Sequence, residues 1–135
     1  MKAVLDTNVL ASAAMTTHGV CAQILDLLVA GVFGICADDR LLDEYDTVLH
    51  RPGLRIVPEE AAIVLELVRS AAEIVSAFPL PAKLPDPSDL PFLEVADAAD
   101  AILVTGNKRH FPPSACGRVT VLSPAAFLDL LRRSA

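Results

Sequence analysis

The sequence predicts an α/β fold in which an open, mostly parallel β-sheet is sandwiched between α-helices. Two observations support this prediction. Segments with strand character alternate with segments of helical character along the 135 residues. The strand segments are also continuously apolar, as in strands that are covered on both faces. Because a chain of this length can bury a substantial core alone, we expect a single domain over residues 1–135.

The first half of the chain contains two expected strands and three expected helices. Short apolar runs indicate the strands, and apolar residues at helical spacing indicate the helices. Gly31 suits the end of the first helix, Asp38 and Asp39 are candidate N-caps of the second, and a Pro-Gly pair at 52–53 ends it. The expected order is a strand at 2–5, a loop or helix start from residue 7, a helix at 21–30, a strand at 32–36, and helices at 39–50 and 58–72.

The second half of the chain is divided by a proline-rich segment. Residues 77–91 contain five prolines and are expected to form an extended loop within the domain. A short strand at 73–75 precedes this loop. A helix at 90–99, strands at 101–105 and 119–122, and a helix at 124–133 follow it.

The formal net charge is −6, from 17 acidic and 11 basic residues. This balance argues against a sequence-specific DNA-binding module, which needs a positive surface. It is compatible with a metal-dependent nuclease, because carboxylates that hold a cation are neutralised by it.

The cysteines and the apolar segments exclude several other classes. Three cysteines without a CxxC pair are not typical of a disulfide framework or a zinc site. No apolar run is long enough for a membrane span. The first ten residues, MKAVLDTNVL, carry an aspartate inside the apolar run, so they make a poor signal peptide. We therefore expect a cytoplasmic protein with no membrane association.

Polar residues follow three of the expected strands. Asp6 follows the strand at 2–5, Asp38-Asp39 the strand at 32–36, and Gly106-Asn107 the strand at 101–105. Ligands of such sheets bind beyond the carboxyl ends of the strands. A polar cluster at this edge of the sheet is therefore predicted from the order of the elements alone.

Asp6 is the strongest single candidate in this cluster. A carboxylate directly after a buried strand lowers stability unless it is paired, hydrogen-bonded or bound to a cation. The alternative interpretation is that Asp6 caps the helix that follows.

Two further carboxylates are compatible with the same edge. Glu44 and Asp46 flank the apolar stripe of the helix at 39–50 on opposite sides, so periodicity does not choose between them. Asp89 falls on the inward side of the helix at 90–99, where it could cap the helix, bind a cation, or do both. Asp100 shares that side, but at ~1.5 Å per residue it lies roughly 16 Å further on.

Three carboxylates from distant parts of the chain suggest a site for a hard divalent cation. Mg²⁺ or Mn²⁺ prefers carboxylate and water oxygens, and such an ion can stabilise charge on a phosphodiester. Asn107 adds an amide oxygen as a potential ligand, although a turn asparagine is the common alternative. Phosphate loops, dinucleotide turns and nucleophilic triads have no counterpart in the sequence.

Four runs in this order resemble the PIN-domain family, in its compact prokaryotic branch that includes VapC-like toxins. They are VLDTNVLASA, LLDEYDTVLHRP, LPDPSDLPFLEVA and DAILVTGNKRHF, and they span nearly the whole chain. The resemblance implies a PIN fold, an acidic site for Mg²⁺ or Mn²⁺, and endoribonuclease activity. It also implies a small antitoxin partner and a possible homodimer.

The resemblance assigns roles to individual residues. The first family acid falls on Asp6, the second on Glu44 and the third on Asp89, and this choice separates Glu44 from Asp46. Asn8 and Thr105 resemble positions that support the site by hydrogen bonds.

One position departs from the wider family, because many PIN domains carry an aspartate at the place of Asn107. A site with one charge fewer makes a second metal doubtful, and it leaves open a non-catalytic module that binds metal or RNA. A phospho-accepting regulatory domain is a third hypothesis, but it needs an acidic pair where VLDTN offers one acid. Lys108, Arg109 and His110, and less strongly Arg51, are candidates for contacting RNA phosphates, with a solvated turn as the alternative.

Overall fold

The computed structural model describes residues 1–134 and contains a five-stranded sheet in which every strand pairing is parallel. The strand order is β3-β2-β1-β4-β5. The strands are β1 (Lys2–Leu5), β2 (Gly34–Ala37), β3 (Glu73–Ile74), β4 (Ile102–Val104) and β5 (Val121–Leu122). The predicted α/β fold with a parallel sheet is therefore confirmed.

Helices occupy the connections between these strands, and one more follows the last strand. They are α1 (Thr7–Met15), α2 (Val20–Val29), α3 (Asp39–Leu49), α4 (Pro58–Ala71), α5 (Leu90–Ala99), α6 (Pro113–Cys116) and α7 (Pro124–Ser134), with short 3₁₀ turns η1 (Pro87–Asp89) and η2 (Lys108–His110). Within residues 1–134, no helix combines the length and the apolar character needed to cross a membrane.

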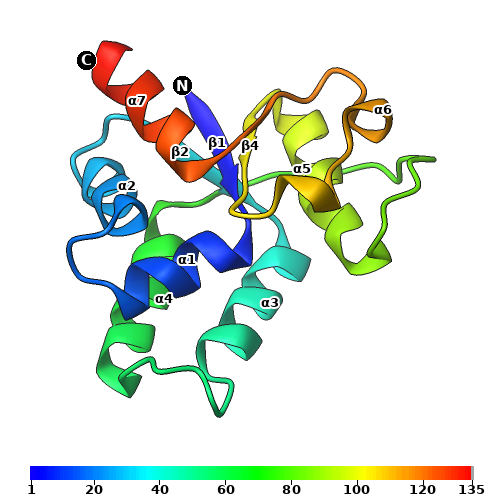
Figure 1. Cartoon of the computed structure of the whole chain (residues 1–135). Helices are drawn as coiled ribbons and strands as arrows, with labels where there is room; N and C mark the ends of the chain where they lie inside the picture. The colour runs from blue at the N-terminus through cyan, green and yellow to red at the C-terminus, as the bar shows by residue number, and fades with distance from the viewer. Residues whose placement is uncertain (135) are drawn as a thin grey trace.

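The helices cover both faces of the sheet. In Figure 1, α1, α2, α4 and α7 lie on one side of the strands, and α5 and α6 lie on the other. Helix α5 packs directly on β1, β2 and β4, while α2 packs on α1 and α7. The fully buried residues of β1 and β4 lie between these layers, which explains why both strands are continuously apolar.

The sheet has a topological switch point between β1 and β4. From β1 the chain moves to β2 and β3 on one side, and it then returns to β4 and β5 on the other. The backbone N–H of Asp6 donates to the Val104 carbonyl (2.9 Å), which extends the pairing of β1 and β4 just past the end of β1. In open α/β sheets, the crevice at such a point is where ligands bind.

The structure corrects several expected boundaries. The segment after Asp6, expected as a loop or a helix start, is the helix α1. The expected strands at 101–105 and 119–122 shorten to β4 and β5, and the strand at 32–36 shifts to β2. Residues 108–110 and 113–116 form η2 and α6, which were not expected, and the proline-rich segment ends in η1.

Candidate active site

Asp6 is the central residue of the predicted polar edge. It is 5% exposed and lies at the carboxyl end of β1, where it is the N-cap of α1. Its Oδ1 accepts the backbone N–H of Thr7 (2.8 Å), and its Oδ2 accepts the hydroxyl of Thr105 (2.8 Å) and the amide of Asn8 (3.3 Å). Asp6 therefore caps the helix, as the alternative interpretation held, and it also joins the ends of β1 and β4.

A second set of contacts fixes the loop after β4 against α1. The backbone N–H of Gly106 donates to the side-chain oxygen of Asn8 (3.0 Å), and the N–H of Asn107 donates to Thr105 Oγ1 (3.0 Å). A Cβ atom on Gly106 would lie 3.3 Å from Asn8 Oδ1, which is tighter than ordinary contact, so the glycine permits this close approach. Asn8 and Thr105, to which the family resemblance assigns a supporting role, both donate hydrogen bonds to Asp6.

Glu44 reaches the same edge from α3. Its Oε2 accepts the hydroxyl of Thr7 at 2.6 Å, and Thr7 is itself buried and adjacent to Asp6. Asp46, the other candidate on this helix, instead pairs with His50 and Arg69. The structure therefore brings Glu44, and not Asp46, to Asp6.

Asp89 approaches from the opposite layer, at the junction of η1 and α5. It makes no side-chain cap bond to α5, so capping does not account for its position. Its Oδ2 lies 2.8 Å from Nδ1 of His110. Apart from this ion pair, the buried Oδ2 atom has no hydrogen-bond partner among residues 1–134.

The pKa values of these groups show that negative charge at the edge is poorly compensated. Burial raises the pKa of Asp6, the hydrogen bonds from Thr105 and Thr7 partly offset this, and the charge of Glu44 raises it again. Burial, followed by the charge of Asp6, raises the pKa of Asp89, although His110 opposes both. Nearby like charges disfavour ionisation, and a bound cation would relieve this cost.

The residues fit a hydrated divalent cation better than a tight cage of protein ligands. Among residues 1–134, no group of three or more His, Cys, Asp or Glu side chains is arranged to hold a metal ion directly. Mg²⁺, however, usually keeps several waters and binds proteins through one or two carboxylates. The carboxylate of Asp6 and the under-satisfied oxygen of Asp89 are oxygen donors of this kind.

The other predicted residues divide into two groups. Asn107 begins η2 and is half-buried beside Thr105, and Lys108, Arg109 and His110 form η2 itself. Arg51 lies beyond the C-terminal end of α3, about two helical turns from Glu44, and is not brought to the site.

Four contacts at or near the site were not predicted. Thr7 links Glu44 to Asp6, and His110 pairs with Asp89. Glu94 is 5% exposed in α5 and accepts from Arg40 of α3 (2.8 Å) and from the backbone of Leu80 (2.8 Å). The signal for Glu94 was present, because it is a single charge within the apolar run LPFLEVA.

The comparisons with known proteins agree with this architecture. The profile of the PIN domain matches residues 2–109. One similar solved structure is a chain from the crystal structure of VapBC2 from Rickettsia felis, bound to a DNA fragment from their promoter. It is 21% identical with a TM-score of 0.58, over 91% of this chain and 98% of that chain, so the likeness concerns the fold. No functionally curated protein matches the sequence. Because the family profile covers most of the chain and ends just past the loop that carries Thr105 and Asn107, the protein belongs to the PIN-domain family.

Proposed function

We propose that the chain is a divalent-metal-dependent endoribonuclease that hydrolyses RNA phosphodiester bonds, and that it is the toxin of a toxin–antitoxin pair. One observation carries the proposal. A buried carboxylate, Asp6, lies at the switch point of the sheet and is held by Thr105, while Thr7 brings Glu44 alongside it. Membership of the PIN-domain family, whose members are generally nucleases, supports the same reading.

Asp6, Glu44 and Asp89, assisted by the amide of Asn107, would hold Mg²⁺ or Mn²⁺. A bound divalent cation supplies positive charge that stabilises the charge developing on a phosphodiester. Asn8, Thr105 and Thr7 fix the orientation of the carboxylates by hydrogen bonds. Supporting partners of this kind commonly change metal affinity or activity by 10–100-fold when removed.

The test is an end-mapped cleavage assay on total RNA with Mg²⁺ or Mn²⁺, and with a chelator as the blank. Asp6→Asn is expected to abolish cleavage, and Glu44→Gln is expected to lower it strongly. Asp46→Asn is the matched control, because Asp46 lies on the same helix but points to His50 and Arg69. Cleavage by Asp6→Asn at the parental rate would overturn the assignment.

Asn107 supports a second candidate, a catalytically weak or inactive module that binds metal or RNA. The amide carries no charge, so the site has one negative group fewer than a four-acid arrangement. Calorimetric titration with Mn²⁺ separates the two functions when it is combined with the cleavage assay. Binding without turnover by the parent, together with cleavage by Asn107→Asp, would favour the inactive module.

For the antitoxin, the structure offers an apolar groove between α1, α2 and α4. Its lining includes Ala14, Leu25 and Val64, and two large apolar side chains at its rim, Val29 and Ile63, are 68% and 60% exposed. Exposed apolar side chains around a groove are typical of protein interaction sites. Asp26 and Glu60 add negative charge to the lining, so the complementary partner is an amphipathic helix with basic flanks.

Co-expression with the product of a short reading frame directly upstream of the gene tests this partner. We expect that product to relieve growth inhibition by the parent but not by Ile63→Lys. Ile74→Lys is the control, because Ile74 is equally exposed at 59% but lies on the edge strand β3. Size-exclusion chromatography with light scattering would test the homodimer that the family resemblance implies.

A further inference from the structure

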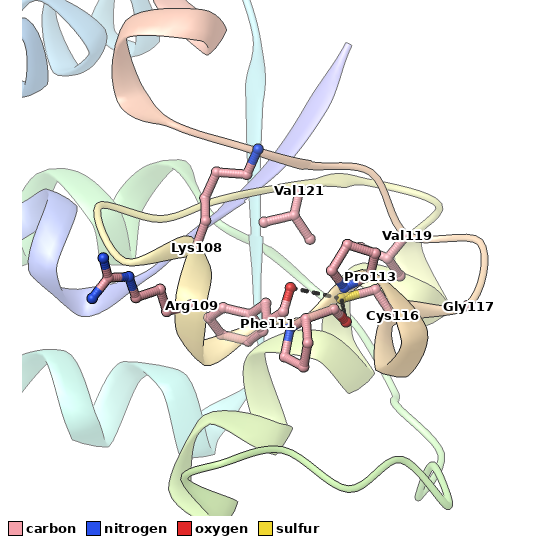
Figure 2. A pocket seen from close by; sticks show the side chains of 9 residues that line it. Lys108, Arg109, Phe111, Pro113, Cys116, Gly117, Val119 and Val121 are labelled. Carbon is pink, nitrogen blue, oxygen red and sulfur yellow. Dashed lines mark hydrogen bonds between the residues drawn. The ribbon is translucent and has the colours of Figure 1, made fainter.

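A cavity of about 650 Å³ is lined by the segment that connects β4 to β5 and by Val121 of β5. Figure 2 shows it from close by, with Lys108 and Arg109 extending from η2 at one side. Its walls are largely apolar and come from Phe111, Pro112, Pro113, Cys116, Val119 and Val121. This volume lies within the range of pockets that bind small organic molecules.

The walls of this cavity are held by the chain around them. The thiol of Cys116 donates to the carbonyls of Phe111 (3.5 Å) and Pro112 (3.3 Å), as the dashed lines in Figure 2 mark. The backbone N–H of Val119 donates to the Cys116 carbonyl at 3.0 Å. The cavity is therefore a formed part of the connection between β4 and β5.

The short turn η2 links the cavity to the acidic edge. Its third residue, His110, pairs with Asp89, while Lys108 and Arg109 line the cavity. Neither Lys108 nor Arg109 forms an ion pair with another residue in 1–134, although the chain has an excess of acids. A 3₁₀ turn rises about 2 Å per residue, so η2 spans roughly 6 Å.

We propose that this cavity binds one unpaired nucleoside of the RNA substrate, next to the phosphate positioned at Asp6. The proposal rests on the nuclease function and adds the location at which one base of the substrate is held. The apolar walls would cover the faces of the base, and Lys108 and Arg109 would contact the flanking phosphates. Two unpaired cations beside an apolar pocket complement an anionic chain that carries flat apolar groups.

The nucleoside must be unpaired because a base inside an A-form duplex cannot enter such a pocket. Proteins read RNA largely through single-stranded segments whose bases can be splayed out and stacked. A stacked base contributes enough to change affinity by roughly 5–150-fold when the contact is removed. The cavity thus predicts one position of the bound RNA at which the base must be unpaired.

The test combines a cavity-filling variant with abasic RNA. Binding is measured by fluorescence anisotropy in Asp6→Asn, so that no cleavage occurs, with labelled single-stranded oligoribonucleotides that carry one abasic residue at each position in turn. We expect one position at which the abasic residue lowers affinity about tenfold. In the Asp6→Asn/Val119→Phe double variant, which fills the cavity, that effect should fall below about twofold.

Val57→Phe in the same background is the matched control, because Val57 is an exposed valine at the start of α4. Lys108→Ala should lower the slope of log affinity against log salt by about 0.7, whereas Arg133→Ala, on α7, should not. Unchanged circular dichroism and melting would show that Val119→Phe still folds.

Equal sensitivity to abasic residues at every position, or the same pattern in both backgrounds, would overturn the subsite. Loss of antitoxin binding in Val119→Phe with RNA binding intact would also overturn it and assign the cavity to a protein partner. The two proposals fail separately. If the parent protein cleaves no RNA but one abasic position still lowers affinity, the nuclease function is refuted and the base subsite is retained. If the parent protein cleaves RNA but no single abasic position lowers affinity, only the base subsite is refuted.

Discussion

Replacing Thr105 with valine tests how the candidate site holds its central carboxylate. Thr105 is fully buried, and its hydroxyl donates to Asp6 Oδ2 (2.8 Å) while accepting from Asn107 N–H (3.0 Å). Valine keeps the shape but removes both hydrogen bonds. A hydrogen bond to a charged group stabilises a fold by about 1.5–3 kcal/mol, so we expect Thr105→Val to lower the free energy of unfolding by ~2 kcal/mol at pH 7.5.

The loss should depend on pH in a defined direction. Burial raises the pKa of Asp6, so its charge lowers stability above that pKa, and this cost disappears as the pH falls through it. Removing Thr105 raises the pKa of Asp6 further and increases the cost only where Asp6 is ionised. At pH 4 the lost contact is closer to a neutral hydrogen bond, so the loss should shrink to about 1 kcal/mol.

Urea denaturation at both pH values measures this difference. At an m-value of roughly 2 kcal/mol/M, the midpoint should fall by about 1 M at pH 7.5. Thr120→Val, at an exposed threonine before β5, is the control and should change stability by less than ~0.5 kcal/mol. An equal loss at both pH values, or a loss below ~0.5 kcal/mol at pH 7.5, would refute the reasoning.

Three further predictions follow from buried or charged groups. Tyr45 is fully buried and donates to the Leu5 carbonyl (2.6 Å), so Tyr45→Phe should lower the free energy of unfolding by about 1.5 kcal/mol in urea, and an unchanged midpoint would contradict this. Glu94→Ala should cost about 2 kcal/mol in the same assay, because it removes a buried acceptor from Arg40, although the exposed guanidinium limits the loss. In thermal melts, Mg²⁺ at ten times its Kd should stabilise the parent protein by ~1.4 kcal/mol at pH 7.5. The stabilisation should be smaller at pH 5, because protons compete with the cation for Asp6. Asp6→Asn should remove it.

The sheet and its edge could be predicted because their signals are local and strong. A continuous apolar run followed at once by a carboxylate identifies both a buried strand and its carboxyl end, and this placed Asp6 correctly. Helix α5 was predicted with its observed bounds, because its apolar spacing is regular and prolines precede it.

The remaining features depend on information that periodicity does not contain. Helix α1 consists largely of small and apolar residues, so its two faces differ little and a helix could not be separated from a loop. The turns η2 and α6 are too short to show a period. Glu44 and Asp46 lie symmetrically about one stripe, so periodicity cannot separate them; the family resemblance does, and in the structure the Thr7 hydroxyl of α1 contacts Glu44.

The pairing of His110 with Asp89 is a contact between distant segments that the local sequence pattern could not predict. The sequence places His110 in a basic run, which suggested phosphate contact, but the carboxylate that it meets comes from the far end of the proline-rich segment. Local charge patterns do not show which of several acids a cation will face after the chain has crossed the sheet.

The contacts that join β1 to β4 also determine when the site can exist. Asp6 and Thr105 are 99 residues apart, and Asn8 and Gly106 are 98 apart. A growing polypeptide therefore carries Asp6 and Asn8 long before the ribosome has added the Thr105 hydroxyl and the Gly106 N–H that hold them in place. Closing so long a loop costs entropy and slows folding. The proposed nuclease would thus gain its activity in one late step, and a fragment that ends before β4 would be harmless to the cell that makes it.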